Sequence, residues 1–205
     1  MSARLLFCSI LLLSFVLSGC ANYIDERFSK DTLISNQDMV YVFRILDKES
    51  ETPVDVIEVV PGFLYENGKI EQDQLRVGPP QLLTAHKGYF VFRSAKSFES
   101  KDVIILSGLR SSEVLRPVAA TGAYGYCKSG KVFAINNIQN GVSYLGDVLV
   151  DLKQGGFSFD TRWDKASLIK FLETNLPNIP THNIKNDELG FFEVDQTCSR
   201  VINIY

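Results

Sequence analysis

The residue best placed for chemistry is Cys20, which directly follows an apolar run near the start of the chain. Arg4 is the only charged residue before it, the stretch from Leu5 to Leu17 is apolar apart from two serines and Cys8, and Ser18-Gly19 follows. This pattern predicts a secretory signal peptide over residues 1–19. The run has about 13 residues, fewer than the roughly 20 that span a bilayer as a helix. A buried helix or a short membrane anchor is the alternative. A cysteine can react as a thiolate, which is the strongest nucleophile among the common side chains.

The four residues Leu17-Ser18-Gly19-Cys20 resemble the bacterial lipobox, whose pattern is a Leu, two small residues and a Cys. The resemblance implies that the Cys20 sulfur receives a diacylglycerol, that cleavage falls before Cys20, and that the new amine is acylated. Ala21 follows, whereas an Asp at this position often marks retention at the inner membrane in Gram-negative lipoproteins. The resemblance therefore implies a lipid-anchored protein of the cell envelope, with the outer membrane favoured, facing the periplasm or the surface.

Two further cysteines, Cys127 and Cys198, remain once Cys8 is removed and Cys20 is modified. An exported protein folds in an oxidising compartment, so we expect a disulfide between Cys127 and Cys198. It would close a loop of about 72 residues and contribute roughly 4 kcal/mol in the chain-entropy model. Two separate buried thiols are the alternative. No metal site is expected, because two cysteines without a nearby histidine cannot supply tetrahedral zinc ligands.

Ser167 and Lys170 form a Ser-x-x-Lys pair, and Lys128-Ser129-Gly130 resembles a motif of penicillin-recognising enzymes, in which serine is the nucleophile. The order of these two motifs is the reverse of that family's, and no Ser-x-Asn element lies between them. We therefore predict that Ser167 is a residue of the first turn of a helix and that Lys170 is solvated.

The two histidines, His86 and His182, lie in polar stretches and have no His, Cys or acidic partner at ligand spacing. The sequence also has no Gly-x-Ser-x-Gly elbow, no phosphate-binding loop and no dinucleotide-binding motif. The Gly and aromatic cluster at residues 122–126 is interpreted as a loop packed by its own rings, with a binding surface as the alternative. The sequence therefore predicts no catalytic residue, no cofactor-binding residue and no metal ligand.

Composition places the chain among ordinary globular proteins. Of its 205 residues, 45% are hydrophobic, and 24 acidic residues outnumber 21 basic ones. This apolar content is too high for a disordered chain, and the slight negative charge argues against a nucleic-acid partner.

The elements that would position these residues are mostly strands. Short runs rich in β-branched and aromatic residues, separated by turn residues, are typical of β-structure. The predicted strands cover Met39–Leu46, Val54–Val60, Phe63–Tyr65, Lys69–Ile70, Gly88–Arg93, Asp102–Ser107, Lys131–Ile135, Val142–Leu152, Phe157–Asp160 and Val201–Tyr205. We expect Pro61-Gly62 to end one strand and Asn67-Gly68 to form a hairpin turn.

One amphipathic helix is predicted after Asp164, which can act as its N-cap. Leu168, Phe171, Leu172 and Leu176 form its apolar face, and Pro177 ends it. The fold class expected is mainly β, a β-sandwich-like domain with one C-terminal amphipathic helix. The domain order is then a signal peptide (1–19), a lipidated N-terminus and tether (20–38), and a β-rich globular domain (39–205).

The segment from Ile138 to Val148 contains Gly-x-x-Tyr-Leu-Gly-Asp and resembles a strand segment of small envelope lipoproteins of uncharacterised function. The resemblance implies a compact β-rich domain on a lipid tether and no particular activity. From the residues themselves, we expect Tyr144 and Leu145 to point to opposite faces of a sheet. Gly146 is expected to leave room for a bulge or a close neighbour.

Together these features favour a non-catalytic binding or assembly module of the cell envelope. The membrane, through the lipid on Cys20, and a second envelope protein are its expected partners. The alternatives are an envelope hydrolase that acts on peptidoglycan, lipid or peptide, and a periplasmic chaperone or assembly factor that uses a sheet edge.

Overall fold

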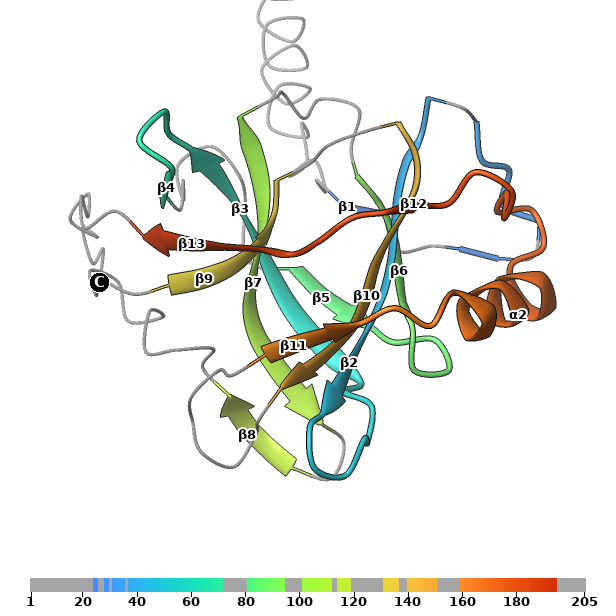
Figure 1. The fold of residues 1–205 in the computed structure, drawn as a ribbon, viewed down its shortest axis with the longest axis horizontal. Coiled ribbons are helices and arrows are strands. Elements are labelled where there is room, and N and C mark those ends of the chain that lie inside the picture. Colours follow the sequence, from blue (N-terminus) through green and yellow to red (C-terminus); the bar gives the residue numbers. More distant parts are fainter. Residues whose placement is uncertain are drawn as a thin grey trace, which may run out of the picture.

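A computed structural model describes residues 24–25, 28–29, 31–35, 37–71, 81–94, 101–111, 114–118, 131–136, 140–150 and 159–194. Two sheets face one another across the domain, and a helix covers the outer face of one of them (Figure 1). The prediction of a mainly β, sandwich-like domain with one helix is therefore confirmed.

Sheet A contains the first strand of the described residues and two long buried strands. Its order is β1-β6-β2-β10-β11, and β12 pairs with β10 as well. The bounds are β1 Ile24–Asp25, β2 Met39–Asp47, β6 Phe90–Ser94, β10 Gly141–Val150, β11 Phe159–Arg162 and β12 Lys185–Asn186. β2 and β10 are parallel neighbours at the centre of this sheet, although nearly a hundred residues separate them in sequence.

Sheet B has the order β5-β3-β4-β13-β9-β7-β8. β3 also pairs with β7, so that β3, β4, β13, β9 and β7 form a ring of paired neighbours. The bounds are β3 Val56–Leu64, β4 Lys69–Glu71, β5 Gln81–Thr84, β7 Asp102–Ser111, β8 Val114–Val118, β9 Lys131–Ile135 and β13 Gly190–Val194.

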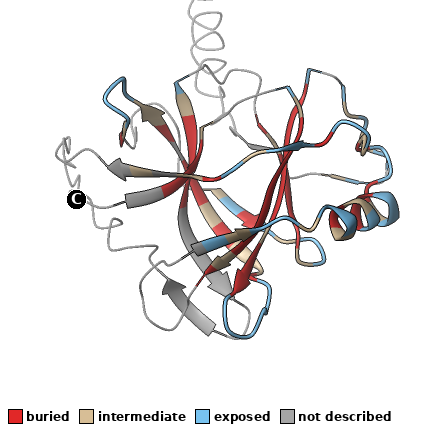
Figure 2. Ribbon diagram, in the orientation of Figure 1, coloured by how far each residue is buried: buried red, intermediate tan, exposed pale blue. Residues whose placement is uncertain are grey.

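The main core lies between the two sheets. β2 is buried along almost its whole length, and its alternate side chains Tyr41 and Phe43 contact Phe92 and Phe90 of β6, each pair with 5.3 Å between ring centroids. The buried residues in Figure 2 are concentrated on these central strands. The almost continuous apolar run along β2 thus supplies side chains to both faces of sheet A, because successive residues of a strand point to opposite sides.

Helix α2 (Lys165–Asn175) packs on the outer face of sheet A (Figure 1). Asp164 is its N-cap, and its side chain accepts a hydrogen bond from the Ser167 backbone N–H at 3.1 Å. The buried residues on the helix are Leu168, Phe171 and Leu172. The predicted N-cap, apolar face and end of this helix are all confirmed.

A β-bulge at Gly146 shapes the outer face of sheet A. The pairing of β10 with β2 shifts between Tyr144 and Asp147, where β10 has one extra residue. Gly146 has a φ of +83°, and a Cβ there would lie 2.5 Å from Thr161 Cγ2 and 3.1 Å from the Arg162 carbonyl oxygen. The extra residue keeps Tyr144 and Asp147 on the same face, while Leu145 points into the core between the sheets. The expectations for Leu145 and for Gly146 are confirmed.

The prediction that Pro61-Gly62 ends a strand is wrong. β3 runs through both residues, and Pro61 pairs with Ile104 of β7. On the other side of β3, the pairing with β5 ends at Val59 and the pairing with β4 begins at Phe63. Among the described residues, Pro61 therefore lies where the strand has a neighbour on one side only, which is where a strand tolerates proline.

Part of the predicted tether lies against the domain. Ile24 and Asp25 form β1, which pairs antiparallel with Ser94 and Arg93 of β6. Phe28 and Ile34 pack against the cluster between sheet A and α2. The predicted strand Val201–Tyr205 lies outside the described residues, as do all four cysteines and residues 122–130.

The bulge can be tested with two glycines that share a positive φ. Gly68 in the hairpin turn has a φ of +78° and open space around its Cβ position, whereas a Cβ at Gly146 collides with Thr161. We expect Gly68→Ala to cost about 1–2 kcal/mol from the left-handed backbone alone. Gly146→Ala should cost at least about 1 kcal/mol more, because the collision is added. Urea unfolding of both variants measures this, and equal losses would contradict the close packing described for Gly146.

Candidate functional site

A fully buried carboxylate, Asp147 of β10, is the centre of a charged cluster on the outer face of sheet A. Arg44 of β2 donates to it from Nε at 2.8 Å and also from a terminal guanidinium nitrogen, which makes the pair bidentate. The Tyr144 hydroxyl donates to the same carboxylate at 2.8 Å. The Asp147 side chain is 0% exposed, so these bonds replace the water that the charge has lost.

The register of the central strands brings these residues together. Arg44 and Asp147 are cross-strand partners in the parallel β2–β10 pair, and the bulge at Gly146 places Tyr144 on the same face. Tyr144 also makes an edge contact with Trp163, at 5.6 Å between ring centroids, next to the start of α2. The cluster thus ties β2 and β10 to the segment that leads into the helix.

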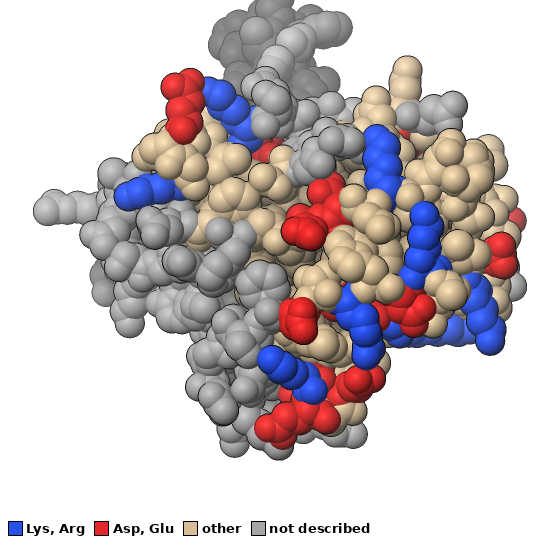
Figure 3. Space-filling model, in the orientation of Figure 1, with Lys and Arg blue, Asp and Glu red and all other residues tan. Residues whose placement is uncertain are grey.

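A more exposed shell of charges surrounds this pair. Arg162 lies with its Nε 3.8 Å from an Asp147 oxygen, and its terminal nitrogen donates to Glu51 at 3.1 Å. Asp164 lies 3.9 Å from Arg44. Figure 3 shows acidic and basic side chains next to one another on this side of the molecule. The charges are therefore largely paired with one another.

The pKa values in the cluster follow from burial and from this pairing. The hydrogen bond to Asp147 raises the pKa of Arg44. Burial raises the pKa of Tyr144, and its hydrogen bond to Asp147 adds to the effect. Hydrogen bonding with Ser167 lowers the pKa of Asp164. Near neutral pH the guanidinium stays charged and the Tyr144 phenol stays protonated, so neither can act as a general base. The arrangement is suited to holding elements in place.

Aromatic rings connect the charged cluster to a pocket. The Arg44 guanidinium lies over the Tyr89 ring at 4.8 Å, a cation–π geometry. Tyr89 in turn stacks on Phe171 of α2, with 4.2 Å between ring centroids, and Phe171 lies 6.1 Å from the His86 ring. Burial raises the pKa of Tyr89, and its hydroxyl has no hydrogen-bond partner among the described residues.

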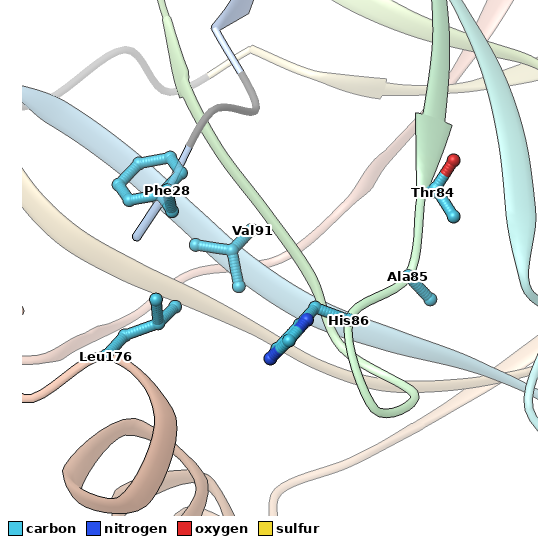
Figure 4. A pocket seen from close by; sticks show the side chains of 6 residues that line it. All are labelled: Phe28, Thr84, Ala85, His86, Val91 and Leu176. Carbon is cyan, nitrogen blue, oxygen red and sulfur yellow. The ribbon is translucent and has the colours of Figure 1, made fainter. Parts of the chain in front are cut away.

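The pocket opens beside this stack and has a volume of about 360 Å³. Segments far apart in sequence meet there: the stretch after β1, the end of β5 with the turn that follows, β6, and the end of α2. The lining residues are Phe28, Thr84, Ala85, His86, Val91 and Leu176. Figure 4 shows Phe28 and Leu176 on one side, Thr84 and Ala85 on the other, and Val91 with His86 between them. The volume is within the range of small-molecule sites, and the walls combine apolar side chains with the exposed polar residues Thr84 and His86.

The residues singled out from the sequence have different places in the structure. His86 lies in the turn before β6 and is exposed at the pocket, whereas His182 is exposed in a turn and does not line it. Ser167 lies in the first turn of α2 and Lys170 is exposed, as predicted. Lys128-Ser129-Gly130, Cys20 and the Cys127–Cys198 pair lie outside the described residues.

The pocket itself is the part of the site that sequence reasoning missed. The Tyr-Leu-Gly-Asp sequence predicted a strand with a bulge or a close neighbour at Gly146. In that strand, Tyr144 and Asp147 form a hydrogen bond. Their partner Arg44 is 103 positions away from Asp147 in the sequence, and no local sequence pattern predicts that Arg44 and Asp147 are in contact.

The part of the chain that the structure describes contains no group of three or more His, Cys, Asp or Glu residues arranged to hold a metal ion. Nor does any helix within the described ranges have the length and apolarity needed to cross a membrane.

Comparisons of the chain with protein-family models, with curated proteins and with solved structures find no match.

The buried Arg44–Asp147 pair should contribute to the free energy of unfolding. Asp147→Asn removes the bidentate counter-ion of Arg44 and leaves it only the more distant and more exposed Asp164. Losing one partner of a buried pair costs about 3–5 kcal/mol. The matched control is Glu66→Gln, which breaks the exposed Lys101–Glu66 pair and should cost about 1 kcal/mol or less. Urea unfolding compares the two, and similar small losses would contradict the structural role of Asp147.

Because the Tyr144 phenol is buried, we expect the folded protein to lose stability at high pH. The pKa of Tyr144 is raised above its ordinary value of 10.0 in the folded chain, so the unfolded chain releases this proton first. The stabilisation is complete below pH 10 and is lost as the pH rises above it. Tyr144→Phe should therefore flatten the decline in unfolding free energy above pH 10, measured by urea unfolding at several pH values. A decline of the same slope in both proteins would overturn the assignment.

Proposed function

We propose that this protein is a lipid-anchored lipoprotein of the bacterial cell envelope whose β-rich domain is a non-catalytic binding module held close to the membrane. The observation that carries the proposal is the distance along the chain between the lipobox and the first strand. Ile24 of β1 pairs with Ser94, only four residues after Cys20. Four extended residues reach at most about 14 Å. A lipid on Cys20 would therefore hold the domain beside the bilayer rather than at the end of a long tether.

The lipid would provide the attachment. Each buried CH₂ contributes roughly 0.8 kcal/mol, and two or more acyl chains give stable anchoring. Ala21 favours the outer membrane, as argued from the sequence. A domain docked through β1 then has a fixed side toward the lipid, because the strand pairs with β6 of the folded sheet.

Two features of the site support a binding role. The pocket has walls of both apolar and polar residues, and one of them, Phe28, belongs to the segment that follows β1. The charged cluster behind the pocket holds its charges in pairs and fixes Tyr89 and Phe171, which stack beside the pocket. An envelope component is thus the expected ligand or partner.

The anchor can be tested with two cysteine variants in a bacterium that processes lipoproteins. An alkyne-tagged fatty acid fed to the cells should label the wild-type protein and Cys8→Ser, and should not label Cys20→Ser. Intact mass of the purified wild type should correspond to a chain that begins at Cys20 with added lipid. Cys8→Ser is the matched control, because it also removes one thiol near the N-terminus. Labelling of Cys20→Ser at the wild-type level would refute the proposal.

A further inference from the structure

We infer that the pocket lined by Phe28, His86 and Leu176 binds one unit of a neutral N-acetylated sugar. The inference rests on the proposed function and deepens it, because it assigns a chemical class to the envelope component that the binding module recognises. Such a sugar carries a methyl group, an apolar ring face, an amide and several hydroxyls, so one small molecule presents both apolar and hydrogen-bonding groups.

The pocket is apolar where it is buried and polar where it is exposed. Val91 and Leu176 are buried, whereas Thr84 and His86 are exposed. Phe28 is partly buried and stands on the same side of the pocket as Leu176 (Figure 4). A ligand that fits this lining turns an apolar group inward and keeps its hydrogen-bonding groups near the rim. A pure hydrocarbon would instead cover the two polar side chains without giving them a partner.

The lining favours a neutral ligand. Among the described residues that line the pocket there is no Asp, Glu, Lys or Arg, and Lys87, in the turn after His86, does not belong to the lining. A charged group placed there would lose water without gaining a counter-ion, which is costly. The Thr84 hydroxyl can both donate and accept a hydrogen bond, and so can the His86 imidazole in its neutral form. Hydroxyl and amide groups, which also donate and accept, are the matching partners.

The polar rim is held in place before any ligand binds. The His86 backbone N–H donates to the Tyr89 carbonyl at 2.7 Å, and the Tyr89 N–H donates back to the His86 carbonyl at 3.1 Å. The two residues between them, Lys87 and Gly88, have φ values of +51° and +84°, as a tight two-residue hairpin turn requires. Tyr89 is fixed in turn by its stack on Phe171. Binding therefore does not have to order this backbone.

These features assign an orientation to the sugar. The acetyl methyl group should lie against Val91 and Leu176, and the hydroxyls should reach Thr84 and His86 at the rim. The Phe28 ring offers a flat apolar wall to the C–H face of the sugar ring. A volume of about 360 Å³ is near the lower end of the range for ligand sites, which favours a single sugar unit.

Saturation-transfer difference NMR of N-acetylglucosamine with the full-length lipidated protein in nanodiscs tests the inference, and empty nanodiscs are the blank. The sugar should bind saturably with a Kd of about 1 mM, and its acetyl methyl protons should receive the most saturation. Glucose, which lacks the acetamido group, should bind at least about fivefold more weakly, because the methyl contact is lost. Equal binding of the two sugars, or no saturable binding of N-acetylglucosamine, would overturn the inference. Tighter binding of N-acetyl-leucinamide than of the sugar would overturn it in favour of a peptide.

Two variants at exposed positions locate the binding. Thr84→Val keeps the shape of the side chain and removes its hydroxyl, and His86→Ala removes the imidazole. Each should weaken N-acetylglucosamine binding about fivefold, the effect of one lost hydrogen bond. His182→Ala is the matched control, because this histidine is exposed in a turn and does not line the pocket. Wild-type affinity in both pocket variants would contradict the assigned site.

Intact mass of the same wild-type preparation separates this inference from the anchor. A chain without lipid refutes the proposed anchor, whatever the sugar does. A lipidated chain that does not bind N-acetylglucosamine refutes only the sugar site.

Discussion

A carboxylate removed from water needs charged or hydrogen-bonding partners, and Asp147 in β10 obtains them from Arg44 and Tyr144. The bulge at Gly146 makes this possible, because it returns Asp147 to the face that already carries Tyr144. Arg44 then lies over Tyr89, which stacks on Phe171 of α2. The buried ion pair in sheet A thus adds, through Tyr89 and Phe171, to the apolar packing that positions the helix and the wall that Leu176 gives to the pocket.

Local sequence patterns were sufficient to predict the structural features that depend on residues close together in the sequence. The spacing of Leu168, Phe171 and Leu172 predicted the buried face of α2, and the turn residues Asn67-Gly68 predicted the hairpin between β3 and β4. The sequence could not show where the long-range partners lie. The parallel pairing of β2 with β10, the continuation of β3 through Pro61, and the pocket all depend on strands that meet only in the folded chain.

The position of β1, which begins four residues after Cys20, changes the interpretation of the N-terminal segment. Read from sequence alone, residues 20–38 are a polar spacer. In the structure β1 adds to the edge of sheet A, and Phe28 packs against the cluster beneath α2. The segment that follows β1 thus forms part of the pocket wall, because Phe28 lines it.

Neutron reflectometry of the lipidated protein on a supported bilayer tests most directly whether the domain is held at the membrane. With β1 docked, protein density should begin within about 14 Å of the lipid headgroups. If residues 20–38 were a free flexible tether, their mean reach would be roughly 20 Å or more. A hydrated gap of that width between the headgroups and the domain would contradict the account.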